Sequence, residues 1–280
     1  KEKVIDDFVE KYSKARTPNP CVVCNKEIKF KALLNKALKI GADYIATGHY
    51  AKIEHGKDRN YLLRANDIKK DQTYMLYGFT QFQLEHTLMP LGSYKKDKVR
   101  KIAENLGFTV HNKADSQEIC FVPDNDYTRF LEENYSDVGT PGPILDTSGN
   151  KLGEHEGLFK YTIGQRRGLG ISLNHPVYVV DFDRKNNALI VGKNDEVFSK
   201  GLWAENNNWI LFEKLNEDLK VQAQIRYNSP MVDATLYTDG KDGMIKVVFT
   251  EKQRAVTPGQ SVVFYDGDYV VGGGIINSSF

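Results

Sequence analysis

The sequence has few cysteines, almost no net charge and no long apolar run. Three cysteines among 280 residues cannot form the fully paired disulfide framework of a small secreted protein, and they indicate a reducing compartment with functional thiols. No apolar run approaches the roughly 20 residues of a membrane helix, and residues 1–7 do not form a signal peptide. We therefore expect a cytoplasmic protein with no membrane partner.

The low net charge limits how the chain could bind RNA. A formal net charge of +1 provides no global attraction to nucleic acid, because overt nucleic-acid binders tend to be strongly basic. Any RNA surface must then be a local patch. The basic run over residues 95–101 is typical of a solvated helix face, whereas Arg166 and Arg167 lie among glycines, and there we favour a functional role.

Two of the three cysteines lie in residues 17–25, Thr-Pro-Asn-Pro-Cys-Val-Val-Cys-Asn. The two prolines predict a stiff, extended loop that presents Cys21 and Cys24. This spacing suits half of a zinc site, a dithiol, part of an iron–sulfur site, or two buried structural cysteines. The third cysteine, Cys120, follows the polar sequence Asp-Ser-Gln-Glu-Ile, which favours reactivity because a thiolate must be accessible to react.

Apolar periodicity predicts the elements of the first half of the chain. Residues 4–12 and 27–40 have helical spacing, and residues 95–106 predict a helix that buries the apolar side chains between Val99 and Leu106. A buried strand over residues 43–47 is expected to lead into a ligand-binding strand end. Alternation of helix and strand indicates a parallel, doubly wound sheet.

From Gly139 onward the pattern changes to short strands and tight turns, at intervals typical of sandwiches or barrels. The sequence therefore predicts an α/β plus all-β protein with three domains. Residues 1–136 are expected to form a partial doubly wound sheet domain, residues 137–194 a small central domain, and residues 195–280 a C-terminal β-barrel.

Residues 17–30 resemble the catalytic segment of the bacterial tRNA-specific 2-thiouridylases, and further matches follow in that family's order across nearly the whole chain. These matches are Ala46-Thr47-Gly48-His49-Tyr50, Lys70-Asp71-Gln72, Asp115-Ser116-Gln117, Cys120-Phe121, Tyr161-Thr162-Ile163-Gly164-Gln165-Arg166-Arg167-Gly168-Leu169-Gly170 and Gly272-Gly273-Gly274. The resemblance implies that the partial sheet domain, residues 1–136, is of the adenine nucleotide α-hydrolase type with nucleotide-binding and catalytic roles. It also implies that the central domain, residues 137–194, contacts tRNA.

The resemblance also implies an activity. Family members use ATP with Mg²⁺ to adenylate the wobble uridine of tRNAs such as those for Lys, Glu and Gln, and a cysteine persulfide then supplies sulfur to its 2-position. The target base is reached by flipping it out of the stack. By this resemblance Cys24 is the catalytic nucleophile and Cys120 carries the persulfide, with disulfide chemistry among the cysteines and a protein as sulfur donor.

Binding residues carry over from the family one position at a time. Asn19, Pro20 and Cys21 match contacts to the target base, and Gly48 matches a contact to ATP. The remaining matches are tRNA contacts, namely His49, Lys70, Asp71, Gln72, Arg226, Tyr227 and Gln260. The structural alternatives are a satisfied core histidine for His49, a helix start with Asp71 as N-cap for residues 70–72, and an ordinary barrel turn for Arg226, Tyr227 and Gln260. Gly272-Gly273-Gly274 is interpreted as a close-packed strand or bulge without chemistry.

Cys21 occupies a position where some family members have Asp. Cys21, Cys24 and Cys120 together could instead hold an iron–sulfur cluster whose open iron binds the incoming sulfur. The sequence leaves this cluster and the persulfide relay as alternatives.

The sequence departs from the family at its start, because these 280 residues contain no Ser-Gly-Gly-Val-Asp-Ser type phosphate loop. The chain resembles a family member without roughly its first quarter, so we expect weak nucleotide affinity and no thiolation by this chain alone. Two other functions are kept as alternatives. One is a tRNA-binding fragment without catalysis, and the other is a structural protein whose cysteines hold zinc or an iron–sulfur cluster.

Overall fold

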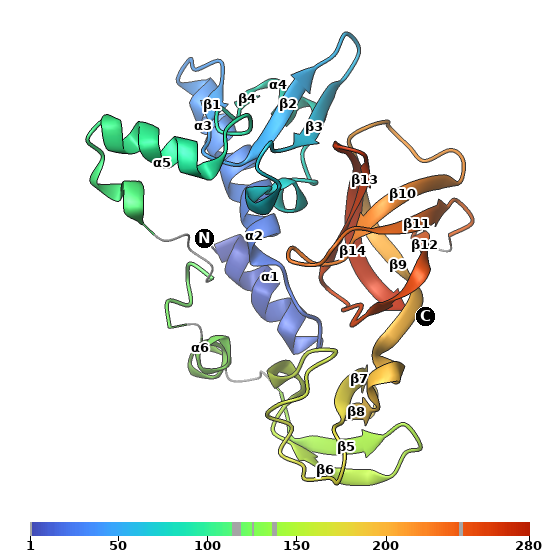
Figure 1. Cartoon of the computed structure of the whole chain (residues 1–280). Coiled ribbons are helices and arrows are strands. Elements are labelled where there is room, and N and C mark those ends of the chain that lie inside the picture. Colours follow the sequence, from blue (N-terminus) through green and yellow to red (C-terminus); the bar gives the residue numbers. More distant parts are fainter. Residues whose placement is uncertain (1, 114–118, 125, 136–138, 241–242) are drawn as a thin grey trace.

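Helices predominate in the first half of the chain and strands in the second (Figure 1). The computed structural model describes residues 2–113, 119–124, 126–135, 139–240 and 243–280. Its helices are α1 (Glu2–Ser13), α2 (Pro20–Val23), the π-helix η1 (Cys24–Leu33), α3 (Leu34–Lys39), η2 (Ile68–Lys70), η3 (Thr73–Met75), α4 (Gln81–Glu85), α5 (Lys96–Asn105), η4 (Thr109–Asn112), α6 (Tyr127–Asn134), η5 (Leu158–Lys160) and η6 (Asn194–Val197).

The strands of the described residues form three sheets. The first is a parallel pair, β1 (Ile45–Ala46) and β4 (Thr87–Leu88). The second has the order β13 (Ser261–Asp266), β10 (Leu219–Gln224), β11 (Val232–Tyr237), β12 (Ile245–Arg254), β9 (Phe198–Trp209), β14 (Tyr269–Ser279), β3 (Asn60–Arg64), β2 (Ala51–His55). The third has the order β6 (Lys151–His155), β5 (Gly142–Asp146), β8 (Ala188–Gly192), β7 (Tyr178–Asp183).

The C-terminal β-barrel is confirmed. Strand β14 pairs with both β9 and β13, which closes the ring β13-β10-β11-β12-β9-β14. Burial alternates along β10, where Val221 and Ala223 face the barrel core and Gln222 between them is exposed. Gly273 lies at the β13–β14 seam, and a Cβ there would approach the Val262 carbonyl oxygen to 2.6 Å. The expectation of a close-packed glycine strand is therefore also confirmed.

The prolines do not produce the extended loop that the sequence predicts for the cysteines. Pro20 opens helix α2, and Asn19 is its N-cap, accepting a hydrogen bond from the Val22 amide through Oδ1 at 3.4 Å. Proline is well tolerated in the first helical turn, because the amide it lacks has no partner there anyway. Helices α2, η1 and α3 follow one another without a break, so Cys21 and Cys24 lie within a helix that begins seven residues before the predicted one.

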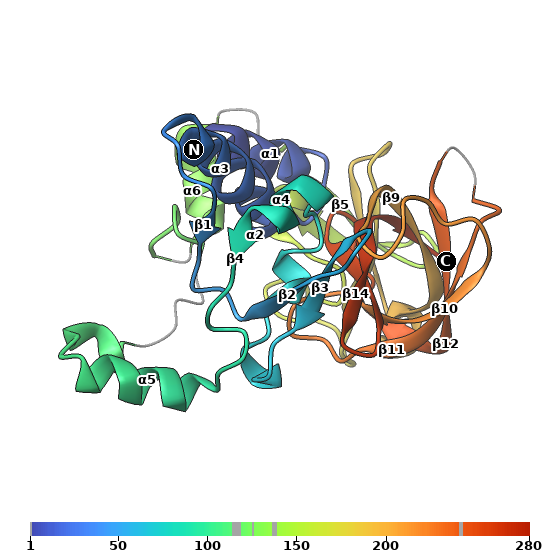
Figure 2. The ribbon, with the colours of Figure 1, turned by 90° about the horizontal axis from the view of Figure 1, so that it is seen from above.

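Helix α5 is confirmed in place, but its predicted burial is wrong. No residue of α5 is buried, and Ile102 and Leu106 are 42% and 67% exposed. The helix projects from the body of the molecule (Figures 1 and 2). Its amphipathic spacing was read correctly, but burial requires a neighbouring element, and none of the described residues supplies one.

One apolar core joins the cysteine-bearing helix to the barrel. Val22 and Phe30 of that helix pack in the same cluster as Tyr74, which follows the β2–β3 hairpin, and as Val263 and Tyr265 of strand β13. The hairpin itself is held to β14 by the pair Tyr269 and Leu63. The barrel therefore serves as the support on which the helix with the cysteines is fixed. In the described part of the chain, no helix is long and apolar enough to span a membrane.

Candidate active site

Cys21 and Cys24 lie in the first turns of one helix and both are free thiols. The backbone amide of Cys24 donates to the carbonyl oxygens of Cys21 and Pro20. Cys21 is exposed and Cys24 is partly buried. The amide groups and dipole of a helix N-terminus favour negative charge, which is the environment in which a reactive thiolate is stabilised.

The third cysteine lies near Cys21 despite a separation of about a hundred residues. Cys120 is free and exposed, and it lies close enough to Cys21 for its charge to act on that thiol. The pKa of Cys21 is raised mainly by desolvation and further by the charges of Cys120 and Cys24, while Lys29 opposes this shift. Cys21 as a whole residue is exposed, but its thiol group is partly desolvated by neighbouring atoms, and the raised pKa reflects the surroundings of the thiol. The residues Asp115, Ser116 and Gln117 lie outside those that the structure describes.

Lys29 and His49 form a polar pair beside the cysteines. The Lys29 ammonium lies 3.4 Å from His49 Nε2, and His49 Nδ1 lies 2.9 Å from Thr47 Oγ1. Desolvation and the nearby Lys29 charge lower the pKa of His49 to about 4, so the ring is neutral near pH 7. With Lys29 donating to Nε2, the ring proton lies on Nδ1 and is donated to Thr47.

Lys29 lies in the π-helical part of the helix, five residues after Cys24. A π-helix hydrogen-bonds from i to i+5, so five residues bring the chain back to nearly the same side, whereas in an α-helix they would leave Lys29 well round the axis from Cys24. Residues 24–33 wind in this way. The sequence analysis missed Lys29 because nothing in the residue pattern distinguishes π from α winding.

The barrel holds the segment before the cysteines directly. Gln260 Nε2 donates to the carbonyl oxygens of Pro18 at 2.9 Å and Thr17 at 3.3 Å. The Thr17 amide in turn donates to the Pro258 carbonyl oxygen at 3.0 Å. Gly259 between them has φ +93°, a conformation that favours glycine. Gln260, predicted as a tRNA contact, thus has a structural role that the sequence did not indicate.

Replacing Gln260 with leucine should loosen this segment. The variant loses two hydrogen bonds of about 1 kcal/mol each, so we expect the free energy of unfolding to fall by about 1 to 2 kcal/mol in urea denaturation. Gln222→Leu, on the exposed face of β10, is the matched control and should change it by less than about 0.5 kcal/mol. Equal stabilities of the Gln260 variant and the unmodified chain would contradict the anchoring role.

Tyr74 connects the predicted base-binding and tRNA-binding residues. Its hydroxyl donates to the Ser261 carbonyl oxygen at 2.8 Å, and its ring centroid lies 6.1 Å from that of Tyr227. Burial raises the pKa of Tyr74, whereas the hydrogen bond with Asn19 and the Arg226 charge oppose the shift. Asn19, Arg226 and Tyr227 are therefore brought around one buried phenol. Tyr74 was also missed, because a buried tyrosine has no distinguishing sequence pattern.

Asp71 and Gln72 are tied into the fold. Asp71 accepts hydrogen bonds from the Ala65 amide at 2.7 Å and from the Thr73 hydroxyl at 2.5 Å. Its bond from the Thr73 amide, 3.3 Å, forms a local turn of the Asx type. The alternative of a helix N-cap at Asp71 is thus wrong, because the 3₁₀ turn η3 that follows has Gln72 as its N-cap. The Gln72 side chain accepts a hydrogen bond from the Tyr50 amide through Oε1 at 2.9 Å.

The other predicted residues lie around this assembly. Gly48 is exposed just beyond the carboxyl end of β1, and a Cβ there would meet only Leu91 Cδ1 at 3.6 Å. This open backbone suits the approach of a nucleotide at the end of a parallel strand. Lys70 ends η2 and is half-buried. Arg166 and Arg167 are exposed in the loop between η5 and β7.

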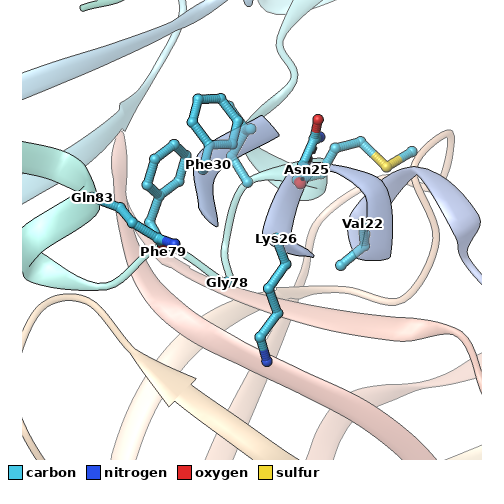
Figure 3. Close-up of a pocket in the computed structure, with 9 residues that line it drawn as sticks. Val22, Asn25, Lys26, Phe30, Gly78, Phe79 and Gln83 are labelled. Atoms are coloured by element: carbon cyan, nitrogen blue, oxygen red, sulfur yellow. Dashed lines mark hydrogen bonds between the residues drawn. The ribbon is translucent and has the colours of Figure 1, made fainter. Parts of the chain in front are cut away.

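Two hollows border the other side of the cysteine-bearing helix. The smaller is lined by Val22, Asn25 and Phe79, among others (Figure 3). Asn25 is buried there and donates to the Met75 carbonyl oxygen at 3.0 Å, which fixes the helix against residues 75–79. The larger, about 300 Å³, separates α1 from the barrel and is lined by Asn19 and Lys26. Neither hollow is lined by a cysteine.

The three thiols do not form a metal site in this arrangement. Among the residues that the structure describes, no three His, Cys, Asp or Glu side chains are grouped so that they could hold a metal ion. The described residues therefore include the three cysteines that an iron–sulfur cluster would need, but the three thiols are not grouped closely enough to bind one. Zinc would need the same convergence of thiolates.

Comparisons with known proteins agree along the whole chain. Family models match residues 1–124 (tRNA methyl transferase HUP domain), 128–193 (tRNA methyl transferase PRC-barrel domain) and 199–276 (Aminomethyltransferase beta-barrel domain). The chain is 64% identical over 280 residues to a tRNA-specific 2-thiouridylase MnmA of Halothermothrix orenii, covering 100% of this chain and 78% of that protein. A relative of the same description from Clostridium beijerinckii is 54% identical over 278 residues, 99% of this chain and 77% of its own.

Proposed function

This chain belongs to the family of tRNA-specific 2-thiouridylases, and we propose that it transfers sulfur from a persulfide on Cys120 to C2 of an adenylated wobble uridine in tRNA. The observation that carries the proposal is the approach of Cys120 to the helix that bears Cys21 and Cys24. A sulfur relay needs its donor and acceptor thiols within reach, although they may be far apart in sequence.

The transfer follows from two substitutions in sequence. The outer sulfur of the Cys120 persulfide attacks C2, and the adenylated oxygen leaves as AMP. The Cys24 thiolate then attacks Cys120 Sγ, so that the sulfur–sulfur bond breaks, the outer sulfur stays on C2 and a Cys24–Cys120 disulfide forms. A dithiol reductant must finally return two electrons and two protons to that disulfide.

Residues of this chain would support each substitution. The helix N-terminus favours negative charge near Cys21 and Cys24, and Lys29 opposes the desolvation that raises the pKa of Cys21. Neutral His49 can accept a hydrogen bond from the Lys29 ammonium through Nε2 and does not repel it. ATP, when bound with Mg²⁺, supplies the leaving group on the uridine oxygen, and the open backbone at Gly48 is the proposed contact to it.

A tRNA surface is proposed around Arg226 and Tyr227. Arg226 is partly buried, and desolvation and the nearby Arg254 charge lower its pKa. Two cations close together gain from an anionic partner, and a phosphate satisfies both. Tyr227 beside them can stack on a base. The proposed partners are wobble-uridine tRNAs, such as those for Lys, Glu and Gln, and a sulfur-donor protein.

Changing Arg226 to alanine should weaken tRNA binding. We expect a loss of about 1 to 2 kcal/mol, the scale of a lost charge-assisted contact, which is roughly a 5- to 30-fold rise in Kd. Affinity should also fall with added salt in the unmodified chain. The control is Lys220→Ala, which removes an exposed charge from the neighbouring strand β10. An unchanged Kd in the Arg226 variant would show that this face of the barrel does not bind RNA.

The decisive experiment is formation of 2-thiouridine in tRNA with ATP and a persulfide donor. It should be run on this chain and on the chain extended by the stretch that its relatives carry outside the match. ATP-dependent product from the extended chain supports the proposal. Binding of tRNA without product in either form would favour the alternative of a tRNA-binding fragment.

A further inference from the structure

Helical geometry places Cys21 and Cys24 within disulfide distance of each other. They are three residues apart, and the Cys24 amide donates to the Cys21 carbonyl oxygen. With a rise of 1.5 Å and 100° per residue, two such Cα atoms are about 5 Å apart. This lies inside the range that disulfides span. The pair can therefore be oxidised without unwinding the helix, although both thiols are reduced in this structure.

The charges around Cys21 change when Cys24 and Cys120 form a disulfide. The charges of Cys120 and Cys24 are two of the three influences that raise the Cys21 pKa, and Lys29 lowers it. A Cys24–Cys120 disulfide carries no thiolate charge, so both of those influences vanish while Lys29 stays. Cys21 is then the one thiol of the three that is still free to attack the disulfide.

We propose that Cys21 is a resolving thiol, which takes over the disulfide left by sulfur transfer and so releases Cys120 for the next persulfide. This inference rests on the proposed function above and assigns Cys21 a role beyond contact with the target base. Cys21 lies on the same helix as Cys24, three residues before it, so it is placed to reach a disulfide that includes Cys24.

The step is a thiol–disulfide exchange. The Cys21 thiolate attacks Cys24 Sγ, the Cys24–Cys120 bond breaks, and Cys120 leaves as a thiolate that takes up a proton. No electrons are gained or lost in this step. The new Cys21–Cys24 disulfide is later reduced by a dithiol, which supplies the two electrons and two protons. Family members with Asp at this position would have to reduce the Cys24–Cys120 disulfide itself.

The test is a disulfide map of the intact 280-residue chain, without tRNA or ATP. The protein is oxidised with diamide, left to equilibrate anaerobically at pH 8, and alkylated with N-ethylmaleimide before peptide mass mapping. We expect the Cys21–Cys24 disulfide to exceed Cys24–Cys120 at least fivefold, with Cys120 alkylated. A predominant Cys24–Cys120 disulfide with alkylated Cys21, or no intramolecular disulfide, would overturn the proposal.

Three variants make the map specific. Cys21→Ser should hold a Cys24–Cys120 disulfide, Cys120→Ser should hold Cys21–Cys24, and Cys24→Ser should hold neither. Far-UV circular dichroism checks their folding, and Cys21→Ala replaces Cys21→Ser if the latter is misfolded. Because the map needs no catalysis, a chain that makes no thiouridine can still give the expected pattern. A chain that thiolates while keeping Cys24–Cys120 at equilibrium would overturn only the resolving role.

Discussion

Serine at Cys24 or at Cys120 should abolish the formation of 2-thiouridine in the extended chain, with a loss of at least a thousandfold in rate. A hydroxyl cannot carry a persulfide, and at neutral pH it is a far weaker nucleophile than a thiolate. Asp at Cys21 should leave the first turnover within about threefold, because Cys21 does not take part in the transfer itself. Thiolated nucleoside is measured by mass spectrometry in single-turnover assays.

The same series separates the relay from an iron–sulfur mechanism. Ser at Cys21 is the informative control, because an Asp at that position could still ligate iron. Activity that survives anaerobic iron removal, together with a persulfide mapped to Cys120, supports the relay. If activity instead follows iron content through all three Cys-to-Ser variants, the relay is wrong.

Acidification should destabilise the fold through His49. Its pKa is lowered to about 4 in the folded state, from an ordinary value of 6.5. His49 is therefore protonated below about pH 6.5 in the unfolded chain, but only below about pH 4 in the folded chain. Stability contributed by the neutral ring is full above pH 6.5 and declines as the pH falls, by about 2 kcal/mol between pH 7.5 and 5. Urea denaturation at the two pH values measures this loss.

The control for this titration is His49→Gln, which keeps a polar side chain beside Lys29 and Thr47 but cannot gain a proton. Other carboxylates and histidines titrate equally in both chains, so the difference between the two pH profiles isolates His49. The variant should lose about 2 kcal/mol less than the unmodified chain over the same interval. Parallel profiles would mean that His49 has an ordinary pKa and is not held neutral by burial and Lys29.

Local sequence patterns were accurate where a short-range rule decides the structure. Helix α1 buries Val4, Phe8 and Tyr12, which is the spacing that the sequence shows. The β2–β3 hairpin pairs two short runs that only four residues separate in the sequence. These elements depend on neighbours a few residues away, and the sequence contains those neighbours.

The same patterns were wrong or silent where distant residues decide. Pro20 was expected in a loop, but packing of Val22 and Phe30 against the barrel stabilises a helix that starts at that proline. Gln260 was expected to face RNA, and its amide also holds the Thr17–Pro18 backbone 242 residues away. Neither contact has any signature in local spacing.

By itself the sequence determined the chemistry available to this protein: three thiols in a reducing context, a glycine at a strand end, and the sequence of motifs that identifies the family. Composition and motifs suffice for this, because reactivity depends first on which atoms are present. Only the tertiary structure decided which atoms meet. Packing against the barrel fixes the cysteine-bearing helix, and the fold brings Cys120 near Cys21 although about a hundred residues separate them. Such contacts arise from long-range packing, because the position of each helix or strand depends on elements that are distant in the sequence.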